Sequence, residues 1–324
     1  MASTYDILDL RHFSGPQLAP LLHEEAARWH PRLRWEYMQA TKLLLEYLDS
    51  RVLPGFVALD NISKQILGYC FCVYEGSKAV IGDVYAFGEA ASATNPLCDV
   101  LLEHLMEMLT HSPSIQRIES QLLMFPAEAF AATRARFDLS IFPRLFLHAA
   151  LENETLSKSL APLARPSSLL LQSWQPEYMR SIAELIHRAY IGHEDAGIND
   201  QYKTVAGAER FLHNIVRFPG CGLFDATNSL VLLDRTTGAP QAVLLCSRVQ
   251  HDTAHITQLC VAPSLRGQGL GRRLLIQCAQ NLRSQGLTHL SLTVTESNQQ
   301  ARALYESLGF TLRERFAALT WSAG

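Results

Sequence analysis

A glycine-rich segment, Arg266 to Gly271 (RGQGLG), carries the clearest chemical signal in this chain of 324 residues. It follows an apolar run from His255 to Val261 and precedes an amphipathic stretch that reaches about Ser284. A strand, a glycine-rich turn and a helix start together suit a phosphate, because glycine allows close backbone approach and the first helical amides lack intrahelical partners. The segment therefore predicts an anion-binding site.

The anion expected at this site is a pyrophosphate. Arg266 and Arg272 flank the loop and offer charge-assisted hydrogen bonds to such a group. The pattern Gly-x-x-x-x-Gly-Lys-Ser/Thr is absent, and counting from Gly267 gives Gly-x-Gly-x-Gly, one residue short of the dinucleotide pattern. A Walker loop and a dinucleotide fold are thus both excluded.

Two sequence blocks resemble the GNAT acyltransferase superfamily. The first is Arg266-x-x-Gly269-x-Gly271, which is similar to the superfamily signature Gln/Arg-x-x-Gly-x-Gly/Ala after the fourth strand. The second, Asn298 to Phe310 (NQQARALYESLGF), is similar to Asn-x-x-Ala-x-x-x-Tyr-x-x-x-Gly-Phe. The blocks occur in the superfamily's order, with an expected helix and strand between them. On these residues the C-terminal half is identified as a member of the superfamily.

The resemblance implies that acetyl-CoA is the co-substrate and binds where strands four and five splay apart at a bulge. The backbone of the fourth strand would pair with the pantetheine arm, and the Val261 amide would face the thioester oxygen. The loop amides would hold the pyrophosphate, and Asn298 would contact the coenzyme. The implied cofactor-binding residues are Leu259, Cys260, Val261, Arg266, Gly267, Gln268, Gly269, Leu270, Gly271, Arg272 and Asn298.

Tyr305 is the residue expected to act as general acid. A phenol has a reference pKa of about 10, close to that of an alkyl thiolate, so it can protonate the departing sulfur. The alternative is that Tyr305 is simply an aromatic core residue beside Leu304 and Leu308. The Asn-x-x-Ala pattern around it favours the catalytic interpretation.

The general base has three candidates. Some members of the superfamily place a glutamate early on strand four, where this chain has His255, and others place one on strand five, where it has Thr293. Glu296, at the end of strand five, is a second candidate, and a water relay is a third. An acyl-cysteine at Cys260 is disfavoured because strand alternation points it away from the face expected for His255, Leu259 and Val261.

The acceptor is expected near residues 191–203, whose polar side chains are mildly acidic and would suit a cationic amine: His193, Glu194, Asp195, Asn199, Asp200 and Tyr202. His187 and His193 lack a useful metal-ligand spacing, so no metal is expected. The seven cysteines also show no metal spacing and are expected to be reduced. Direct attack by a small-molecule or peptide amine is the expected reaction.

Composition bounds the class of protein. The chain is long enough for two domains, and 48% hydrophobic with 18% charged residues supports sizeable cores. A net charge of -3 gives no reason to expect nucleic acid or an anionic membrane as partner. We expect a cytoplasmic protein, monomeric or homodimeric, since the chain shows neither an N-terminal basic-apolar segment nor a run of 18 apolar residues.

The two halves repeat one pattern. A shift of 174 residues places strand-like and helix-like runs of the first half on those of the second in the same order, although few identities are retained. The interpretation is an α/β (α+β) chain of two tandem GNAT-like acyl-CoA N-acyltransferase folds, each a mixed, mostly antiparallel sheet flanked by helices. The expected domains are residues 1–152, a linker at 153–167, and a catalytic domain at 168–324.

The first lobe lacks the motif residues. The shift places Ser92 opposite Arg266, and Ala93, Asn95 and Leu97 opposite the three glycines. It also places Met124 opposite Asn298 and Ala131 opposite Tyr305. We therefore expect residues 1–152 to be a degenerate lobe without a cofactor site, packing on the catalytic lobe as one wall of its substrate cleft.

The function expected from these residues is transfer of an acetyl group from acetyl-CoA to a primary amine. A related alternative is a mycothiol-synthase-like enzyme, since that tandem GNAT protein acetylates a cysteinyl amine on a sugar-inositol carrier. A different alternative is a non-catalytic acyl-CoA sensor or scaffold. Retention of Tyr305 and Asn298 argues against the last of these.

Overall fold

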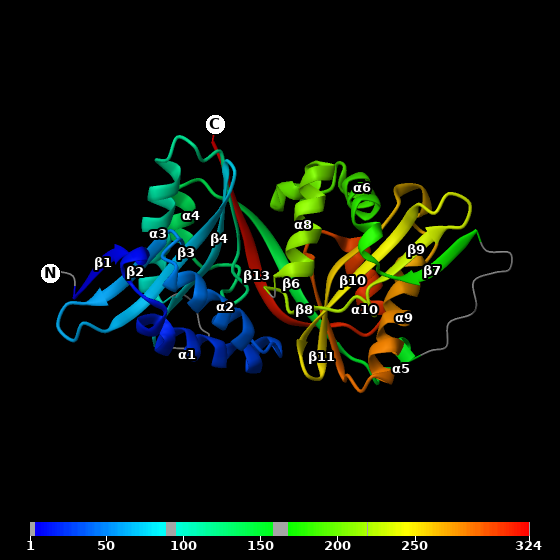
Figure 1. Ribbon diagram of the computed structural model, residues 1–324, viewed down its shortest axis with the longest axis horizontal. Helices are drawn as coiled ribbons and strands as arrows, with labels where there is room; N and C mark the ends of the chain where they lie inside the picture. Colours follow the sequence, from blue (N-terminus) through cyan, green and yellow to red (C-terminus); the bar gives the residue numbers. More distant parts are fainter. Residues whose placement is uncertain (1–3, 89–94, 158–167, 219, 324) are drawn as a thin grey trace. The chain divides into compact units, whose positions relative to one another are not determined.

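The computed structural model describes residues 4–88, 95–157, 168–218 and 220–323. The chain divides into two compact units, one formed by Met1–Arg144 with Glu314–Gly324 and the other by Leu145–Arg313. Each unit contains its own strands and helices, which Figure 1 labels in chain order. The fold is of the α/β class, with a mixed, mostly antiparallel sheet flanked by helices, as the sequence predicts.

The first unit builds its sheet from five consecutive strands and closes it with the last strand of the chain. The order is β1-β2-β3-β4-β5, and β13 pairs antiparallel with β5. Its elements are β1 (Tyr5–Asp9), α1 (Gly15–Leu33), α2 (Met38–Asp49), β2 (Gly55–Asp60), β3 (Ile66–Glu75), β4 (Lys78–Ala86), α3 (Pro96–Thr110), β5 (Arg117–Gln121), α4 (Ala131–Arg136) and the start of β6 (Ser140–Ala150).

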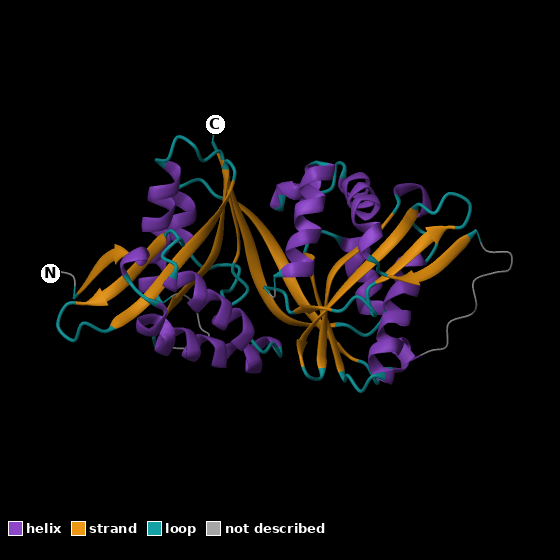
Figure 2. Ribbon diagram, in the orientation of Figure 1, coloured by secondary structure: helices purple, strands orange, loops and turns teal. Residues whose placement is uncertain are grey.

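The second unit repeats this arrangement with the order β6-β12-β11-β10-β9-β7, and β8 pairs with β10. Figure 2 shows helices beside the strands in each unit. Its elements are α5 (Glu154–Ser157), β7 (Leu169–Ser173), α6 (Met179–Tyr190), α7 (Asp195–Ile198), α8 (Val205–Arg217), β8 (Leu223–Phe224), β9 (Leu230–Asp234), β10 (Pro240–Gln250), β11 (Thr253–Val261), α9 (Leu270–Ser284), β12 (His289–Thr295), α10 (Gln299–Ser307) and β13 (Thr311–Ser322).

The tandem repeat is present in the structure. Helix α3 and helix α9 have the same length and lie 174 residues apart in sequence, and the hairpin β3–β4 corresponds to β10–β11. In both units a parallel strand pair follows this hairpin, β4 with β5 and β11 with β12. The repeated periodicity thus reflects a repeated fold.

The boundary between the units does not fall at a single position in the chain, because the first unit contains residues from both chain ends. Strand β6 begins in the first unit and ends in the second, where Leu147, Ala149 and Leu151 enter the core beside α9. Strand β13 begins in the second unit and ends in the first, where Ala317 and Leu319 join the core beside α3. Of the proposed linker, residues 154–157 form α5 and residues 158–167 lie outside the described residues.

The first unit contains a buried pair of acids. Glu25 on α1 accepts a hydrogen bond from the Tyr69 hydroxyl at 2.8 Å and one from the Trp29 indole nitrogen at 3.4 Å. Asp83 on β4 faces it and accepts from the Val84 amide at 2.8 Å. Burial raises the pKa of Glu25 well above its usual range and the pKa of Asp83 to about 6. The pair therefore retains protons that the unfolded chain would release.

This pair should make the first unit less stable as the pH rises. Between about pH 4 and the raised pKa of Asp83, the folded state binds more protons than the unfolded state, so the free energy of unfolding falls with increasing pH. We expect a loss of at least about 2 kcal/mol between pH 4 and pH 6, the window set by Asp83, and a further loss at higher pH from Glu25. Chemical denaturation across this range measures it. Glu25→Gln should flatten the dependence, Asp6→Asn at an exposed position should not, and equal slopes in all three proteins would contradict the assignment.

Candidate functional site

The start of α9 leaves its first amides without a protein cap. Gly269 occupies the N-cap position with φ of 75°, and no side chain caps the helix there. The first backbone hydrogen bond at this end joins the Arg273 amide to the Gly269 carbonyl oxygen at 3.0 Å. The amides of Leu270, Gly271 and Arg272 precede that bond. They and the positive end of the helix dipole are thus available to an anion.

Two kinds of glycine occur in this loop. Gly267 and Gly269 have φ of 77° and 75°, a backbone conformation that side chains rarely adopt. Gly271 has no such constraint, and a Cβ there would lie 3.6 Å from Leu304 and no closer to any other atom outside its own turn. The protein itself could accommodate alanine at this position. A glycine in the first turn therefore leaves space that a ligand can use.

The two arginines of the motif are anchored to neighbouring helices. Arg266 donates from Nη2 to the carbonyl oxygen of Ala189 at 2.5 Å, and Arg272 donates from Nη1 to Ser307 Oγ at 2.8 Å. A guanidinium has five N–H donors, so one such bond leaves others for an anion. The arginines can therefore fix the loop and add positive charge beside the helix tip.

Strands β11 and β12 separate beside this helix tip. Their parallel pairing runs from Thr253 with His289 to Ile256 with Leu292 and ends there. The next residue of β11, Thr257, is the extra residue of a bulge, because Cys246 of β10 pairs with Ile256 whereas Leu245 pairs with Gln258. The bulge turns the end of β11 away from β12. The resulting splay is the geometry that the resemblance implies.

The backbone of β11 beyond the bulge alternates in direction. The Ala262 amide donates to the Gln241 carbonyl oxygen at 2.8 Å, so Ala262 and, two residues earlier, Cys260 direct their backbone groups toward β10. Leu259 and Val261 direct theirs toward the gap left by β12. Of the three predicted pantetheine contacts, the geometry supports Leu259 and Val261 as the residues that offer an open strand edge.

The bulge also changes which side chains share a face. Leu259 and Val261 pack against the core beside α9, and so do Ala254 and Ile256, which flank His255. Cys260, in contrast, packs into the core beside α6 and α8. The expectation that His255 shares the face of Leu259 and Val261 is therefore wrong, because one extra residue inverts the alternation. Burial raises the pKa of the Cys260 thiol to about 12, which leaves it protonated and a poor nucleophile.

Tyr305 lies on α10 and is buried on the α9 side of the sheet. Its ring packs edge-on against Phe310, with the centroids 5.9 Å apart, and its side chain is 8% exposed. Tyr190 belongs to the opposite face, where it packs against the core beside α6 and α8. The pKa of Tyr190 is raised well above its usual value by burial, with further contributions from Tyr202, Asp195, Cys260 and Tyr305.

Sequence reasoning missed Tyr190 and Gln258. The Tyr190 hydroxyl donates to Gln258 Oε1 at 3.3 Å, and the Tyr190 ring stacks on Tyr202 with centroids 4.2 Å apart. Gln258 lies on β11, directly after the bulge. One signal was available, since Gln258 is a polar residue within the apolar run that ends at Val261.

The acidic loop after α6 is held against the end of β12. Asp195 accepts a hydrogen bond from Thr295 Oγ1 at 2.5 Å, and Glu194 accepts one from Ser297 Oγ. His193 Nε2 lies 3.3 Å from Asn298 Nδ2. The loop predicted to contact the acceptor thus lies next to the splayed strand ends.

Asn298 caps helix α10. Its Oδ1 accepts from the Ala301 amide at 3.0 Å, and its Nδ2 faces His193. Both ends of the side chain are therefore engaged within the protein, which gives Asn298 a structural role beside any coenzyme contact.

Replacing this cap should lower stability independently of any effect on coenzyme binding. Asn298→Ala should lower the free energy of unfolding by about 1 kcal/mol, because the helix loses the cap of its first turn. Asn298→Asp keeps an oxygen in the same place and should remain close to the wild type in chemical denaturation. Equal losses in both variants would show that the cap is not what stabilises this helix.

The two candidate bases differ in their surroundings. His255 is 4% exposed, its Nδ1 lies 2.9 Å from Ser291 Oγ, and its ring stacks on Phe146. It lies in the paired part of β11, before the splay. Glu296 follows β12 directly and is half-buried, and its carbonyl oxygen accepts from Arg302 Nη1 at 3.1 Å. Glu296 is the better placed of the two to exchange a proton with solvent.

The equivalent helix of the first unit starts differently. Asn95 caps α3 by accepting from the Leu97 amide at 3.0 Å, and Pro96 at the first helical position has no amide hydrogen. The bulge and the splay are nevertheless retained there, since the β4–β5 pairing ends at Ile81 and Ser120. Ser92 and Ala93 lie outside the described residues. This unit thus keeps the sheet geometry without an uncapped helix tip.

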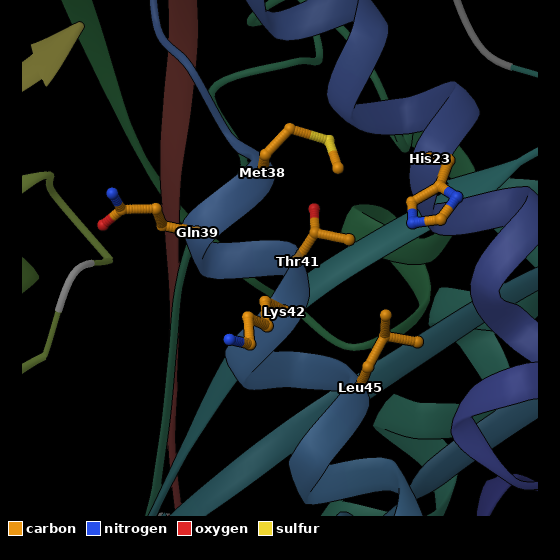
Figure 3. A pocket seen from close by; sticks show the side chains of 6 residues that line it. All are labelled: His23, Met38, Gln39, Thr41, Lys42 and Leu45. Carbon is orange, nitrogen blue, oxygen red and sulfur yellow. The ribbon is translucent and has the colours of Figure 1, made fainter.

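A surface cavity elsewhere in the first unit does not coincide with any predicted site residue. It has a volume of about 400 Å³ and lies between α1 and α2, where His23 faces the side chains of the second helix (Figure 3). Within the described part of the chain, no group of three or more possible metal ligands occurs, and no helix combines the length and apolar character needed to cross a membrane.

Comparison with known proteins matches part of the second unit to one family. Residues 198–310 match the model of the acetyltransferase (GNAT) family. A tandem GNAT protein from the clavulanic acid biosynthesis pathway superposes on 99% of this chain and 99% of its own with a TM-score of 0.58 at 14% identity. A GNAT protein of Sphaerobacter thermophilus covers 99% of this chain and 96% of its own with a TM-score of 0.65 at 13% identity.

Two curated relatives match parts of the second unit. The ribosomal protein bS18-alanine N-acetyltransferase of Escherichia coli is 38% identical over 88 residues, which are 26% of this chain and 60% of that protein. The mycothiol acetyltransferase of Thermobispora bispora is 53% identical over 51 residues, 16% of this chain and 17% of that protein. The chain thus matches less than two thirds of either relative.

Fold and motifs define an α/β chain with two acyltransferase-type folds in tandem. Residues 198–310, within the second unit, match the GNAT family, and the chain as a whole has the fold of a tandem GNAT protein.

Proposed function

We propose that this chain is an acetyl-CoA-dependent N-acetyltransferase whose second unit transfers the acetyl group directly to a primary amine. The observation that carries the proposal is the combination, in one unit, of an uncapped helix tip with an open strand edge. The tip suits a diphosphate, and the edge at Leu259 and Val261 can pair with the amides of pantetheine as an added strand would.

The proposed reaction is a single displacement. The amine nitrogen attacks the thioester carbonyl carbon, the carbon–sulfur bond then breaks, and the sulfur receives a proton from the Tyr305 hydroxyl. The Val261 amide would stabilise the negative oxygen of the tetrahedral intermediate, a contribution of about 3 kcal/mol for one such donor. Burial of Tyr305 beside Phe310 keeps its ring fixed for this transfer.

The attacking amine must also lose a proton. His255, Glu296 and a water relay are the candidates, and we favour Glu296 or water. His255 is buried, its Nδ1 contacts Ser291, and it precedes the splay.

The first unit would bind no coenzyme. Asn95 caps the helix that corresponds to α9, and Pro96 removes one of its free amides. The described residues of this unit therefore offer no equivalent of the uncapped helix tip, although its strands splay in the same way.

An amine panel tests the function. Acetyl-CoA with wild-type protein should release free thiol only when an acceptor amine is present, at a rate that saturates with the amine. Peptides that begin with alanine and cysteinyl amines belong in the panel, because the two curated relatives are named for alanine and mycothiol. Tight coenzyme binding without amine-dependent thiol release would favour a non-catalytic sensor.

A further inference from the structure

Gln258 holds a buried hydrogen-bond donor that the protein leaves without a partner. Its side chain is 5% exposed, and its Oε1 accepts from the Tyr190 hydroxyl. Its Nε2, however, has no hydrogen-bond partner in the described part of the chain. Buried amide donors nearly always have one, so a group from outside the protein is expected here.

The Gln258 Nε2 group lies on the side of β11 from which the amine substrate would approach the thioester. Gln258 directly follows the bulge of β11, two residues before Cys260, whose side chain packs beside α6 and α8. Tyr190, its partner, packs edge-on against His193 with the ring centroids 5.2 Å apart, and the Asp195 amide donates to His193 Nδ1 at 3.1 Å. Helix α9 covers the opposite face, where Leu259 and Val261 pack. With the coenzyme phosphates held at α9, the face of Gln258 is left to the acceptor.

The side chains of Gln258 and Asp195 together favour one class of amine substrate. An N–H donor needs an oxygen or nitrogen acceptor, and a protonated amine offers none. The carboxylate of Asp195, in contrast, suits an ammonium group. We infer that Gln258 is a specificity-determining residue, and that its Nε2 donates to the carbonyl oxygen of an α-aminoacyl acceptor, an amine whose neighbouring carbon carries an amide or ester carbonyl. This inference rests on the proposed N-acetyltransferase function.

Two amines of similar size test it. Alaninamide has the carbonyl, and sec-butylamine replaces that carbonyl with a methylene group and the amide nitrogen with a methyl group. With kcat/KM corrected to the free-amine concentration, wild type should prefer alaninamide by at least about tenfold, and Gln258→Met should reduce this ratio to near one. Gln258→Asn, which keeps a shorter amide, should give an intermediate ratio. Thermal unfolding and coenzyme A affinity are measured for each variant to confirm a folded second unit.

A binding measurement separates this inference from the proposed function. Calorimetry of alaninamide with the coenzyme A-loaded protein should show at least tenfold weaker binding to Gln258→Met than to wild type, whether or not turnover occurs. Absence of turnover with retained alaninamide discrimination would overturn the function and support the contact. An unchanged kcat/KM ratio in Gln258→Met would overturn the inference. If kcat/KM falls equally for both amines, Gln258 Nε2 contacts the thioester instead.

Discussion

Gly269→Asp is expected to abolish measurable acetyl-CoA binding while leaving the protein folded. The carboxylate would lie at the tip of α9, in the open space around Gly269, where the diphosphate is proposed to bind. The aspartate weakens binding in two ways, because its charge repels the phosphates and its side chain occupies the free amides. A unit charge at about 4 to 5 Å from a phosphate costs about 3 kcal/mol near a protein surface, which corresponds to at least a hundredfold loss of affinity.

Gly269→Asn is the matched control for this variant. Asparagine and aspartate have nearly the same shape, and both tolerate the left-handed conformation that Gly269 adopts at φ of 75°. Any backbone strain is therefore shared, and the difference between the two variants measures charge. We expect Asn to bind at least ten times more tightly than Asp in calorimetry. Equal affinities would show that no anion binds at this helix tip.

Tyr305→Phe should lower kcat by about a hundredfold or more with little change in the KM for acetyl-CoA. Phenylalanine preserves the ring that packs against Phe310, so the core should remain intact. Only the proton for the departing sulfur is lost, and general acid catalysis typically contributes 10² to 10⁴ in rate. Steady-state kinetics with the best amine of the panel measures this effect.

Tyr190→Phe distinguishes the roles of the two phenols, Tyr190 and Tyr305. It removes the hydroxyl that donates to Gln258, and it should act mainly through the KM of the amine. Wild-type turnover in Tyr305→Phe would remove Tyr305 from the mechanism. A large fall of kcat in Tyr190→Phe alone would transfer the role of general acid to Tyr190.

The helix tip could be predicted from sequence because its signal is local. Glycines at 267 and 269 are needed for a left-handed backbone, and the order of strand, turn and helix is visible in the hydrophobic pattern. The tandem architecture was equally accessible, since helices α3 and α9 repeat at a fixed shift. Both features depend on residues close together in the chain.

Features that depend on pairing between distant segments were not accessible. The resemblance implies a bulge, but its position at Thr257 appears only when β10 and β11 are placed in register, and that position reverses the face on which His255 lies. The exchange of β6 and β13 between the units follows from long-range pairing, which no local pattern records. The engagement of Asn298 with Ala301 and His193 likewise requires the folded loop.

The first unit shows which part of the site its sequence has lost. Its strands still separate after Ile81 and Ser120, as β11 and β12 do after Ile256 and Leu292. Its helix start, in contrast, is closed by Asn95. The splay alone is therefore a property of the repeated fold, and the uncapped tip distinguishes the second unit.

Calorimetric titration of the full chain with coenzyme A tests the central claim most directly. We expect saturable binding of one molecule per chain, at a site that Gly269→Asp removes. Absence of binding, or two equivalent molecules per chain, would contradict the assignment of a single coenzyme site to the start of α9.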